Sequence, residues 1–427
     1  MRTKVRLVAS RGRLLKVGIL LGVALALGLA GPLDAASAAP AGPAAPRTEL
    51  LSWGLNAWGN LGNGKVTDSD LPVVVKMPAG VKVAQERAGG TFSVALTVGH
   101  GVYAWGSNLS GQLGVGRTKG IGYVKGSHVP VQVHLPRLVG TQVAQVRAGS
   151  NFGLALTAAG QVWAWGEGGG GEIGNGQTSN AHVPVHVPMP GGAKIASISA
   201  GCLHSLARTT SGEVLAWGDN KYGELGDDST ADSDVPVRVQ LPRNFKAVDI
   251  AAGCFHSLAV DASGKIFAWG SNQDGQLGDG QPNLVNPLPI EIFPQVPGTA
   301  IGKVTQLYGG CEHTLALTSK DVVLAWGDDT VGQLGIAPAK SVTRPTRVAT
   351  LAGRGVTAIA AGCFTSYART SSGRALAWGE GDSGELGNAT FGDVKIPVGV
   401  HLPAGDSATG IESGPSSSTA FVIVTTS

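Results

Sequence analysis

Short stretches in which hydrophobic and polar residues alternate, separated by turn residues, fill most of this 427-residue chain. In residues 235–270, four stretches have the period of a half-buried strand: 236–239, 247–251, 256–260 and 266–269. Between the last two lies Asp261-Ala262-Ser263-Gly264, which has the composition of a hairpin turn. No segment after residue 38 has a convincing helical period. The pattern therefore predicts an all-β protein.

The same arrangement recurs with a period of 52 residues. Each copy contains a Trp-Gly pair and, nine residues after the Trp, the Gly of a Leu-Gly or Ile-Gly pair, as in Trp217-Gly218 and Leu225-Gly226. The seven Trp residues are Trp53, Trp105, Trp165, Trp217, Trp269, Trp326 and Trp378. Two copies carry insertions, of 8 and 5 residues. A fixed period of this length is typical of repeat architectures.

Four strands in each period predict a four-stranded antiparallel sheet, and seven such sheets bury one another's faces if they are arranged radially. A second repeated phrase, as in Gly253-Cys254-Phe255-His256-Ser257, places its Gly 16 residues before the Trp in six copies. Trp53 has no such phrase before it, and Gly414 has no Trp after it. The sequence thus predicts a seven-bladed β-propeller over residues 49–427, whose ring is closed by a blade built from N- and C-terminal strands.

The repeated phrases resemble those of the regulator of chromosome condensation family, as in Ala-Trp-Gly-Ser-Asn-Gln-Asp-Gly-Gln-Leu-Gly at 268–278 and Ala-Gly-Cys-Phe-His-Ser-Leu-Ala at 252–259. The resemblance covers about residues 50–424 and implies a seven-bladed β-propeller. Family members include a nuclear guanine-nucleotide exchange factor for a small GTPase, other eukaryotic regulators and secreted bacterial propellers, some of which resemble β-lactamase inhibitor proteins. The chain is most similar in its features to an exported bacterial member.

Residues 1–38 have the three parts of a secretory signal peptide. Six basic residues precede an apolar run of 14 residues from Val17 to Ala30, and Ala36-Ser37-Ala38 provides a cleavage site. Because a membrane span requires roughly 20 apolar residues, we expect export rather than an uncleaved anchor. Residues 39–48 are rich in Ala and Pro and are expected to form a flexible lead-in. The expected location is secreted, either extracellular or associated with the cell wall.

Removal of this signal changes the charge balance. The segment holds six of the 32 basic residues and one of the 29 acidic residues, so the mature chain has a net charge near −2. Such a balance does not indicate a nucleic-acid partner. No other segment is long enough to span a membrane, and we expect a monomer.

Two motifs imitate functional sequences but belong to the repeat. Gly381-Asp382-Ser383-Gly384 matches a serine-protease nucleophile signature, yet it aligns with residues 220–223 of the Trp217 copy. Residues 166–174 are rich in glycine like a phosphate-binding loop, but no helix follows them. We therefore expect no catalytic residue, no cofactor and no enzymatic activity.

Two further groups have the chemistry of metal ligands. His204, His256 and His313 share one position of the repeat, so three imidazoles around an axis could hold a metal, or each could hydrogen-bond within the strands. One turn contains four aspartates that could bind calcium weakly or remain solvated: Asp227, Asp228, Asp232 and Asp234. The sequence favours the structural alternative for both groups, and we expect no metal.

The cysteines are more informative. Cys202, Cys254, Cys311 and Cys363 follow the repeated Gly in four consecutive copies, and an exported chain with an even number of cysteines permits disulfides. Neighbouring blades bring such positions to a Cα separation of about 5.5–6 Å only about 6–7 Å from the axis, on the innermost strands. The candidate bridges are Cys202–Cys254 and Cys311–Cys363, and four buried thiols are the alternative.

The insertions depart most from the period, and loops on a rigid scaffold commonly carry binding. The 8-residue insertion falls between Leu113-Gly114 and Pro130, where Arg117, Lys119 and Lys125 surround Tyr123 in a compact basic loop, residues 115–127. The other insertion falls within about 281–301, which contains five prolines. Neutral loop drift is the alternative for both.

We therefore expect an exported, non-catalytic protein-binding propeller, of scaffold or inhibitor-like type, with an acidic protein partner. Two other functions remain open. One is a guanine-nucleotide exchange factor-like regulator, which the family resemblance implies. The other is an extracellular enzyme or cell-wall-associated factor.

Overall fold

The computed structural model describes residues 48–116, 125–136, 142–282, 285–294, 301–336 and 341–426. The chain divides into two units, 1–44 and 45–427. The expected signal peptide at 1–38 and all of the lead-in except Thr48 lie outside the described residues. Among the residues that are described, none belongs to a helix with the length and apolar character of a membrane span.

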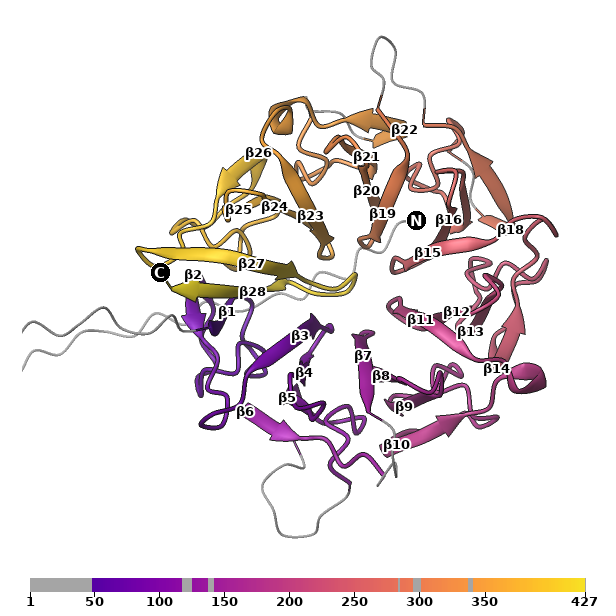
Figure 1. Ribbon diagram of the computed structural model, residues 1–427, viewed down its shortest axis with the longest axis horizontal. Helices are drawn as coiled ribbons and strands as arrows, with labels where there is room; N and C mark the ends of the chain where they lie inside the picture. Colours follow the sequence, from indigo (N-terminus) through magenta and orange to yellow (C-terminus); the bar gives the residue numbers. More distant parts are fainter. Residues whose placement is uncertain are drawn as a thin grey trace, which may run out of the picture. The chain divides into compact units, whose positions relative to one another are not determined.

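The described part of the second unit contains seven antiparallel sheets of four strands each, arranged as blades around an axis (Figure 1). Blade 1 consists of β3 (Val83–Ala88), β4 (Phe92–Thr97), β5 (Val102–Ser107) and β6 (Gly126–Gln132), and blade 2 of β7 (Val143–Ala148), β8 (Phe152–Thr157), β9 (Val162–Gly166) and β10 (Ala181–Val187). Blade 3 consists of β11 (Ile195–Ala200), β12 (His204–Thr209), β13 (Val214–Gly218) and β14 (Ser233–Arg238), and blade 4 of β15 (Ala247–Ala252), β16 (His256–Asp261), β17 (Ile266–Ser271) and β18 (Val285–Ile292). Blade 5 consists of β19 (Val304–Gly309), β20 (His313–Thr318), β21 (Val323–Asp328) and β22 (Ser341–Arg347), and blade 6 of β23 (Val356–Ala361), β24 (Thr365–Thr370), β25 (Ala375–Gly379) and β26 (Val394–Gly399). Blade 7 consists of β27 (Asp406–Glu412), β28 (Thr419–Thr426), β1 (Thr48–Gly54) and β2 (Ser69–Val74).

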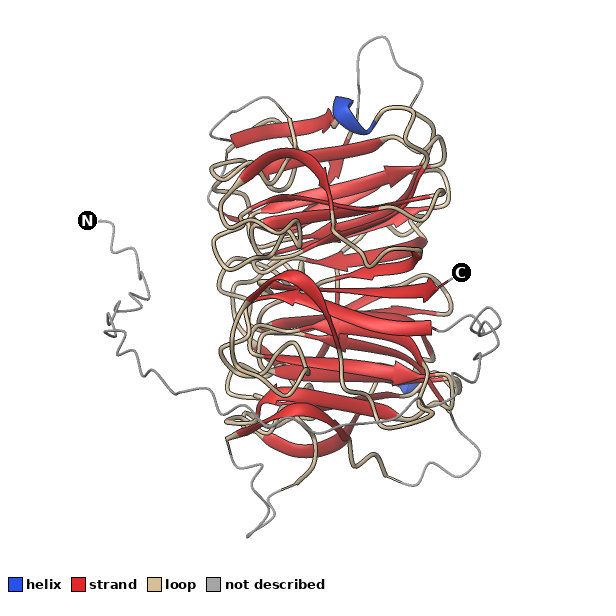
Figure 2. Ribbon diagram, turned by 90° about the vertical axis from the view of Figure 1, so that its left-hand side faces the viewer, coloured by secondary structure: helices blue, strands red, loops and turns tan. Residues whose placement is uncertain are grey.

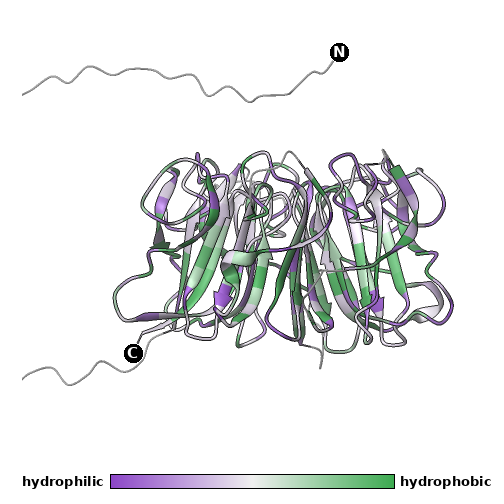
Figure 3. Ribbon diagram, turned by 90° about the horizontal axis from the view of Figure 1, so that it is seen from above, coloured by the Kyte–Doolittle hydropathy of each residue, from purple (hydrophilic) through white to green (hydrophobic). Residues whose placement is uncertain are grey.

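The helical content of the described chain is two 3-10 turns, Pro190–Gly192 and Ala349–Leu351, so strands and loops account for nearly all of it (Figure 2). Hydrophobic residues lie mainly along the packed strands (Figure 3). The prediction of an all-β, seven-bladed propeller is confirmed.

Blade 7 closes the ring with strands from both ends of the chain. All seven residues of β1 pair with β28, from Thr48 opposite Thr425 to Gly54 opposite Thr419. The sheet order is β2-β1-β28-β27, so the C-terminal strands supply the inner half of the blade. The predicted closure is confirmed, because β1 has a pairing partner on each side, β28 toward the axis and β2 toward the outside.

The repeated Trp explains why the period is so strict. The indole Nε1 of Trp269 donates to the backbone carbonyl oxygen of Glu224 in the preceding blade, at 2.7 Å, and the ring is fully buried. Equivalent bonds join all seven blades: Trp53 to Glu385, Trp105 to Asn60, Trp165 to Gln112, Trp217 to Glu172, Trp326 to Gln276 and Trp378 to Gln333. The Trp of each blade is therefore the link to its neighbour.

The Gly of the Leu-Gly pair makes room for this link. Gly226 has a φ of +64°, and a Cβ there would lie 2.8 Å from Nε1 of Trp269. A side chain at this position would both strain the backbone and displace the indole of the next blade. This contact accounts for the Gly that accompanies the Trp in every copy.

Strand register locates the insertions. Ser127 pairs with Gly106 as Ser233 pairs with Gly218, but Ser127 lies 13 residues after Gly114 whereas Ser233 lies seven after Gly226. Six of the eight extra residues therefore lie between β5 and β6, and the other two lie between β6 and β7. The expectation that all eight precede Pro130 was wrong, because a second connection of the blade is also lengthened.

Candidate functional site

One side of the propeller carries most of the features that the sequence singled out, although not the connection from β18 to β19. In an antiparallel four-stranded blade, the first and third connections emerge on the same side. We call this side the loop face: it holds the turns between first and second strands and the Trp-Gly loops between third and fourth strands. The described ends of the basic insertion, Gly116 and Lys125, lie between β5 and β6 on the loop face, whereas the chain leaves β18 toward β19 on the opposite side.

Backbone hydrogen bonds narrow the channel at the loop face. The amide of Ser150 donates to the carbonyl oxygen of Cys202 at 3.0 Å, and that of Cys311 donates to the carbonyl oxygen of Cys363 at 3.0 Å. Similar bonds run from Cys254 to Gly310 and from Cys363 to Ser417. The inner turns of successive blades are thereby drawn together around the axis.

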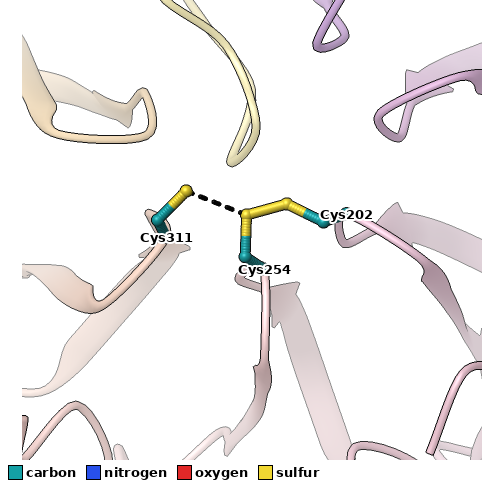
Figure 4. Close-up of side chains that lie close together, drawn as sticks. All are labelled: Cys202, Cys254 and Cys311. Atoms are coloured by element: carbon teal, nitrogen blue, oxygen red, sulfur yellow. Dashed lines mark hydrogen bonds between the residues drawn. A yellow bond between two sulfur atoms is a disulfide. The ribbon is translucent and has the colours of Figure 1, made fainter. Parts of the chain in front are cut away.

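The cysteines lie on these inner turns. Cys202 is paired with Cys254 and Cys311 with Cys363, with Cα separations of 4.3 and 4.5 Å. The two pairs also touch, since Sγ of Cys254 lies 3.0 Å from Sγ of Cys311 (Figure 4). The sequence was interpreted as two separate pairs and missed this single cluster. The signal was present, because equivalent positions in consecutive blades must converge where they approach the axis.

A polar cavity of about 260 Å³ lies in the channel beside the cysteines. Arg87 forms an ion pair of 3.0 Å with Glu412, and the hydroxyl of Tyr308 donates to Glu412 at 2.9 Å. Arg147 has no carboxylate oxygen within 4.0 Å among the described residues. Burial, together with the charge of Arg87, lowers the pKa of Arg147 to about 10. Sequence reasoning missed these residues, although their inner-strand position differs from blade to blade.

The residues that follow the cysteines form an apolar centre on the loop face. Leu203, Phe255 and Phe364 are half-buried and pack against the sulfur cluster. The ring of Tyr222 lies edge-on to Phe255, with centroids 5.5 Å apart. These side chains present apolar surface next to the axis without being fully exposed.

Carboxylates surround this apolar centre. Burial raises the pKa of Glu312 to about 7, and the charges of Asp274 and Asp328 add to the shift. Burial likewise raises the pKa of Asp219 and of Glu380, and neighbouring aspartates contribute in both cases. Like charges are therefore crowded at several places on the described part of this face.

The structure describes only the two ends of the basic loop, residues 115–127. Arg117, Lys119 and Tyr123 lie outside the described residues. Lys125 is exposed at the foot of the loop, and its carbonyl oxygen accepts a bond of 3.1 Å from the amide of Asn108.

The three histidines link neighbouring blades. Nε2 of His204 lies 2.9 Å from the hydroxyl of Ser257, and His256 and His313 make the same contact with Thr314 and Ser366. All three rings are buried, and burial lowers the pKa of each to about 3. Nε2 of each ring therefore serves a contact between blades, as the hydrogen-bonding alternative predicted, while Nδ1 of His256 and of His313 has no hydrogen-bond partner among the described residues.

The other candidate motifs are parts of the blade loops. The amide of Ser383 donates to the carboxylate of Glu385 at 2.8 Å, and the amide of Gly170 donates to Glu172 at 2.9 Å. In the acidic turn, Asp227 accepts from the amide of Ser229, and Asp232 accepts from the amide of Asn220. These polar groups make hydrogen bonds within their own loops.

Together, the fold and the loop face define a repeat propeller with a closed ring and irregular loops on one side. The model of the RCC1-like domain matches residues 49–420, and the chain belongs to this family. The chain is 34% identical to the ultraviolet-B receptor UVR8 of Arabidopsis thaliana over 67% of its length and 62% of that protein, and 32% identical to the E3 ubiquitin-protein ligase HERC2 of Homo sapiens over 88% of its length and 8% of that protein.

The fold is also close to that of solved propellers. Yeast RCC1 (Prp20) bound to Kap60 superposes with a TM-score of 0.77 at 23% identity, covering 90% of each chain. Prp20p from Saccharomyces cerevisiae gives a TM-score of 0.76 at 24% identity, over 88% of this chain and 91% of that one. At this level of identity the similarity concerns the fold alone. The chain spans less than two thirds of the length of UVR8 and of HERC2.

Proposed function

We propose that this chain is a non-catalytic protein-binding propeller that is exported and binds its partner on the loop face. The observation that carries the proposal is the apolar centre formed by Leu203, Phe255 and Phe364, which crowded carboxylates surround on a rigid closed ring. Apolar anchors inside a polar rim are typical of protein interfaces. Family relationship supports a binding or regulatory role, since the relatives include a receptor and a ligase, and Prp20p is described by its binding to Gsp1p and histones.

Two kinds of charge are expected to select the partner. The described carboxylates favour a cationic segment above the channel end, and Arg117, Lys119 and Lys125 favour an acidic segment at the edge of blade 1. Tyr123 would supply an aromatic anchor in the same loop. A partner that carries both a cationic and an acidic segment would bind the loop face in one orientation.

Export is proposed from the sequence of residues 1–38. Fractionation of the producing cell checks it, and N-terminal sequencing of the mature chain locates the cleavage site. A chain found only in the cytoplasm would contradict export and would favour the alternative of exchange on a cytoplasmic GTPase.

A pull-down from the cell-wall and culture proteins identifies the partner, and variants then locate the site. We expect Tyr123→Ala to weaken binding by about 2 kcal/mol and Phe255→Ala to weaken it comparably. Phe293→Ala is the matched control, because Phe293 is 63% exposed and follows β18 on the opposite side. Replacement of residues 115–127 by the short loop of a regular blade tests the basic loop as a whole. Unchanged affinity in both the loop replacement and Phe255→Ala would remove the loop face as the site.

A further inference from the structure

All four cysteines belong to one sulfur cluster at the end of the channel. The Sγ atoms of Cys202, Cys254 and Cys311 lie within 4.8 Å of one another (Figure 4). Cys363 joins them through its disulfide with Cys311. Each sulfur comes from a different blade, so the ring itself sets the spacing. No local turn motif is needed to bring them together.

This spacing is close to that of a four-thiolate metal centre. Zinc binds thiolate sulfur at about 2.3 Å in a tetrahedron, so the sulfur atoms of such a centre lie roughly 3.8 Å apart. Three sulfurs already lie within 4.8 Å of one another, and reduction would let the paired atoms separate to the distance required. We propose that the reduced cluster binds one Zn²⁺ through Cys202, Cys254, Cys311 and Cys363.

The surroundings favour such a centre. Four thiolates and one zinc ion carry a net charge of −2, which needs nearby cations when buried. The cavity beside the cluster is lined by Arg87 and Arg147, and Pro415 borders both the cavity and the cluster. Leu203 and Phe255 cover the cluster toward the loop face and limit access of water.

Zinc and the disulfides compete for the same sulfur atoms. A cysteine in a disulfide offers no thiolate, so the proposed site exists only after a thiol reductant has supplied the four electrons that return both disulfides to four thiols. The reductant is itself oxidised to disulfide, and the four cysteine thiols release their protons when zinc binds. Binding of zinc in turn withholds the thiols from oxidation. The two forms of the cluster are thus mutually exclusive, and metal content reports which one is present.

Cobalt provides a direct probe of the site. The mature chain is reduced, freed of reductant without oxygen, and titrated with Co²⁺, whose tetrahedral thiolate complexes absorb strongly in the visible and near-ultraviolet. We expect saturation at one Co²⁺ per chain and loss of the absorption when Zn²⁺ is added. The oxidised chain is the control and should bind none. Absence of a saturable thiolate band in the reduced, folded chain would overturn the proposal.

Single substitutions test the ligand set. Cys363→Ser and Cys254→Ser should each weaken the thiolate absorption and lower the affinity by an order of magnitude or more. Ser150→Ala is the matched control, because Ser150 holds the equivalent position in blade 2 without sulfur, and it should bind as the parent chain does. An unchanged spectrum in Cys363→Ser would exclude the four-ligand centre.

If reduction unfolds the chain, the effect of Zn²⁺ on its folding tests the proposed site. Zinc that binds only the folded ring stabilises it by mass action. One equivalent of Zn²⁺ should restore the circular dichroism of the reduced chain but not of reduced Cys363→Ser. Failure of Zn²⁺ to restore the parent chain would count against the site.

Discussion

The two halves of the ring join their blades by different means. Between blades 3 and 6, His204, His256 and His313 reach a hydroxyl in the next blade, and the four cysteines lie on the same blades. In blades 1 and 2, Phe92 and Phe152 take the place of the histidines. The half that contains the chain ends thus relies on apolar packing and on the pairing of β1 with β28.

Both halves keep the Trp link, so this bond is what the fold requires. We call the contact between two neighbouring blades a seam. At its other positions the side chains differ in chemistry from seam to seam, while the geometry stays the same. His256 contacts Thr314, whereas Phe152 packs in the core between blades 2 and 3. The repeat thus determines the Trp links that all seven blades share. The polar and sulfur contacts are additional, and they occur between blades that contain no chain end.

The largest effect is expected from removal of the C-terminal strands. Deletion of residues 411–427 removes β28 and strips β1 of every pairing partner toward the axis. Phe421, Val422 and Val424 are fully buried, so their loss also opens the core. We expect loss of the cooperative thermal transition, measured by calorimetry. Melting within a degree or two of the intact chain would show that closure contributes little.

The frame could be predicted from sequence because it repeats. Seven Trp residues, their Gly partners and the unmatched ends at Trp53 and Gly414 determined blade number and closure. The site could be predicted only in part, because its residues are those that do not repeat. Arg147 and Glu412 face the channel from inner strands whose periodicity gives burial but not direction along the axis. The sulfur cluster could not be predicted from the sequence, because the distance between the inner turns and the axis was not known.

A buried carboxyl group, that of Glu86, lies in the half of the ring that contains the chain ends. It occupies the position that Val146 holds in blade 2, it is 1% exposed, and neither carboxylate oxygen has a hydrogen-bond partner among the described residues. Burial raises its pKa to about 8, with a further contribution from Glu412. A carboxyl group in this position is destabilising in its charged form.

Glu86→Leu should therefore stabilise the ring by an amount that depends on pH. The folded pKa is raised above the unfolded value, so the wild-type chain loses stability as pH rises from about 4.5 to about 8. We expect a gain on the order of 4 kcal/mol above pH 8 and a much smaller gain near pH 4.5. Denaturant unfolding at both pH values measures it. Glu86→Gln is the control, which removes the titration without adding apolar contact; a pH-independent difference between Glu86→Gln and the wild type would contradict the argument.

In the other half, the sulfur contacts can be removed in pairs. If Cys202–Cys254 and Cys311–Cys363 form in the exported chain, each closes a loop of 52 residues, and replacing either pair by Ala should cost about 4 kcal/mol. Peptide mapping without reductant identifies the bridges. Four alkylatable cysteines in the denatured, unreduced chain would exclude both, and a Cys254–Cys311 bridge would leave two free thiols.

The smallest effect is expected from replacing one of the histidines that contact the next blade. His256→Phe gives blade 4 the residue that blades 1 and 2 carry, and Thr314 keeps its bond of 2.8 Å to the carbonyl oxygen of Gln276. We expect a cost of about 1 kcal/mol at pH 8, the typical value of one hydrogen bond. His256→Ala should cost about 3 kcal/mol, because it leaves a cavity in the seam.

The pH dependence separates this polar contact from packing. Burial lowers the pKa of His256 in the folded chain to about 3. Below about pH 6.5 the imidazole of the unfolded chain is protonated while that of the folded chain is still neutral, so the contribution of His256 to stability is lost as pH falls. His256→Phe has no such loss, and its deficit at pH 8 should shrink and then reverse by pH 4. Chemical denaturation at several pH values follows the difference between the two chains. A deficit that stays constant from pH 8 to pH 4 would mean that the imidazole is not held neutral in this seam, and that the two halves of the ring differ less than their contacts indicate.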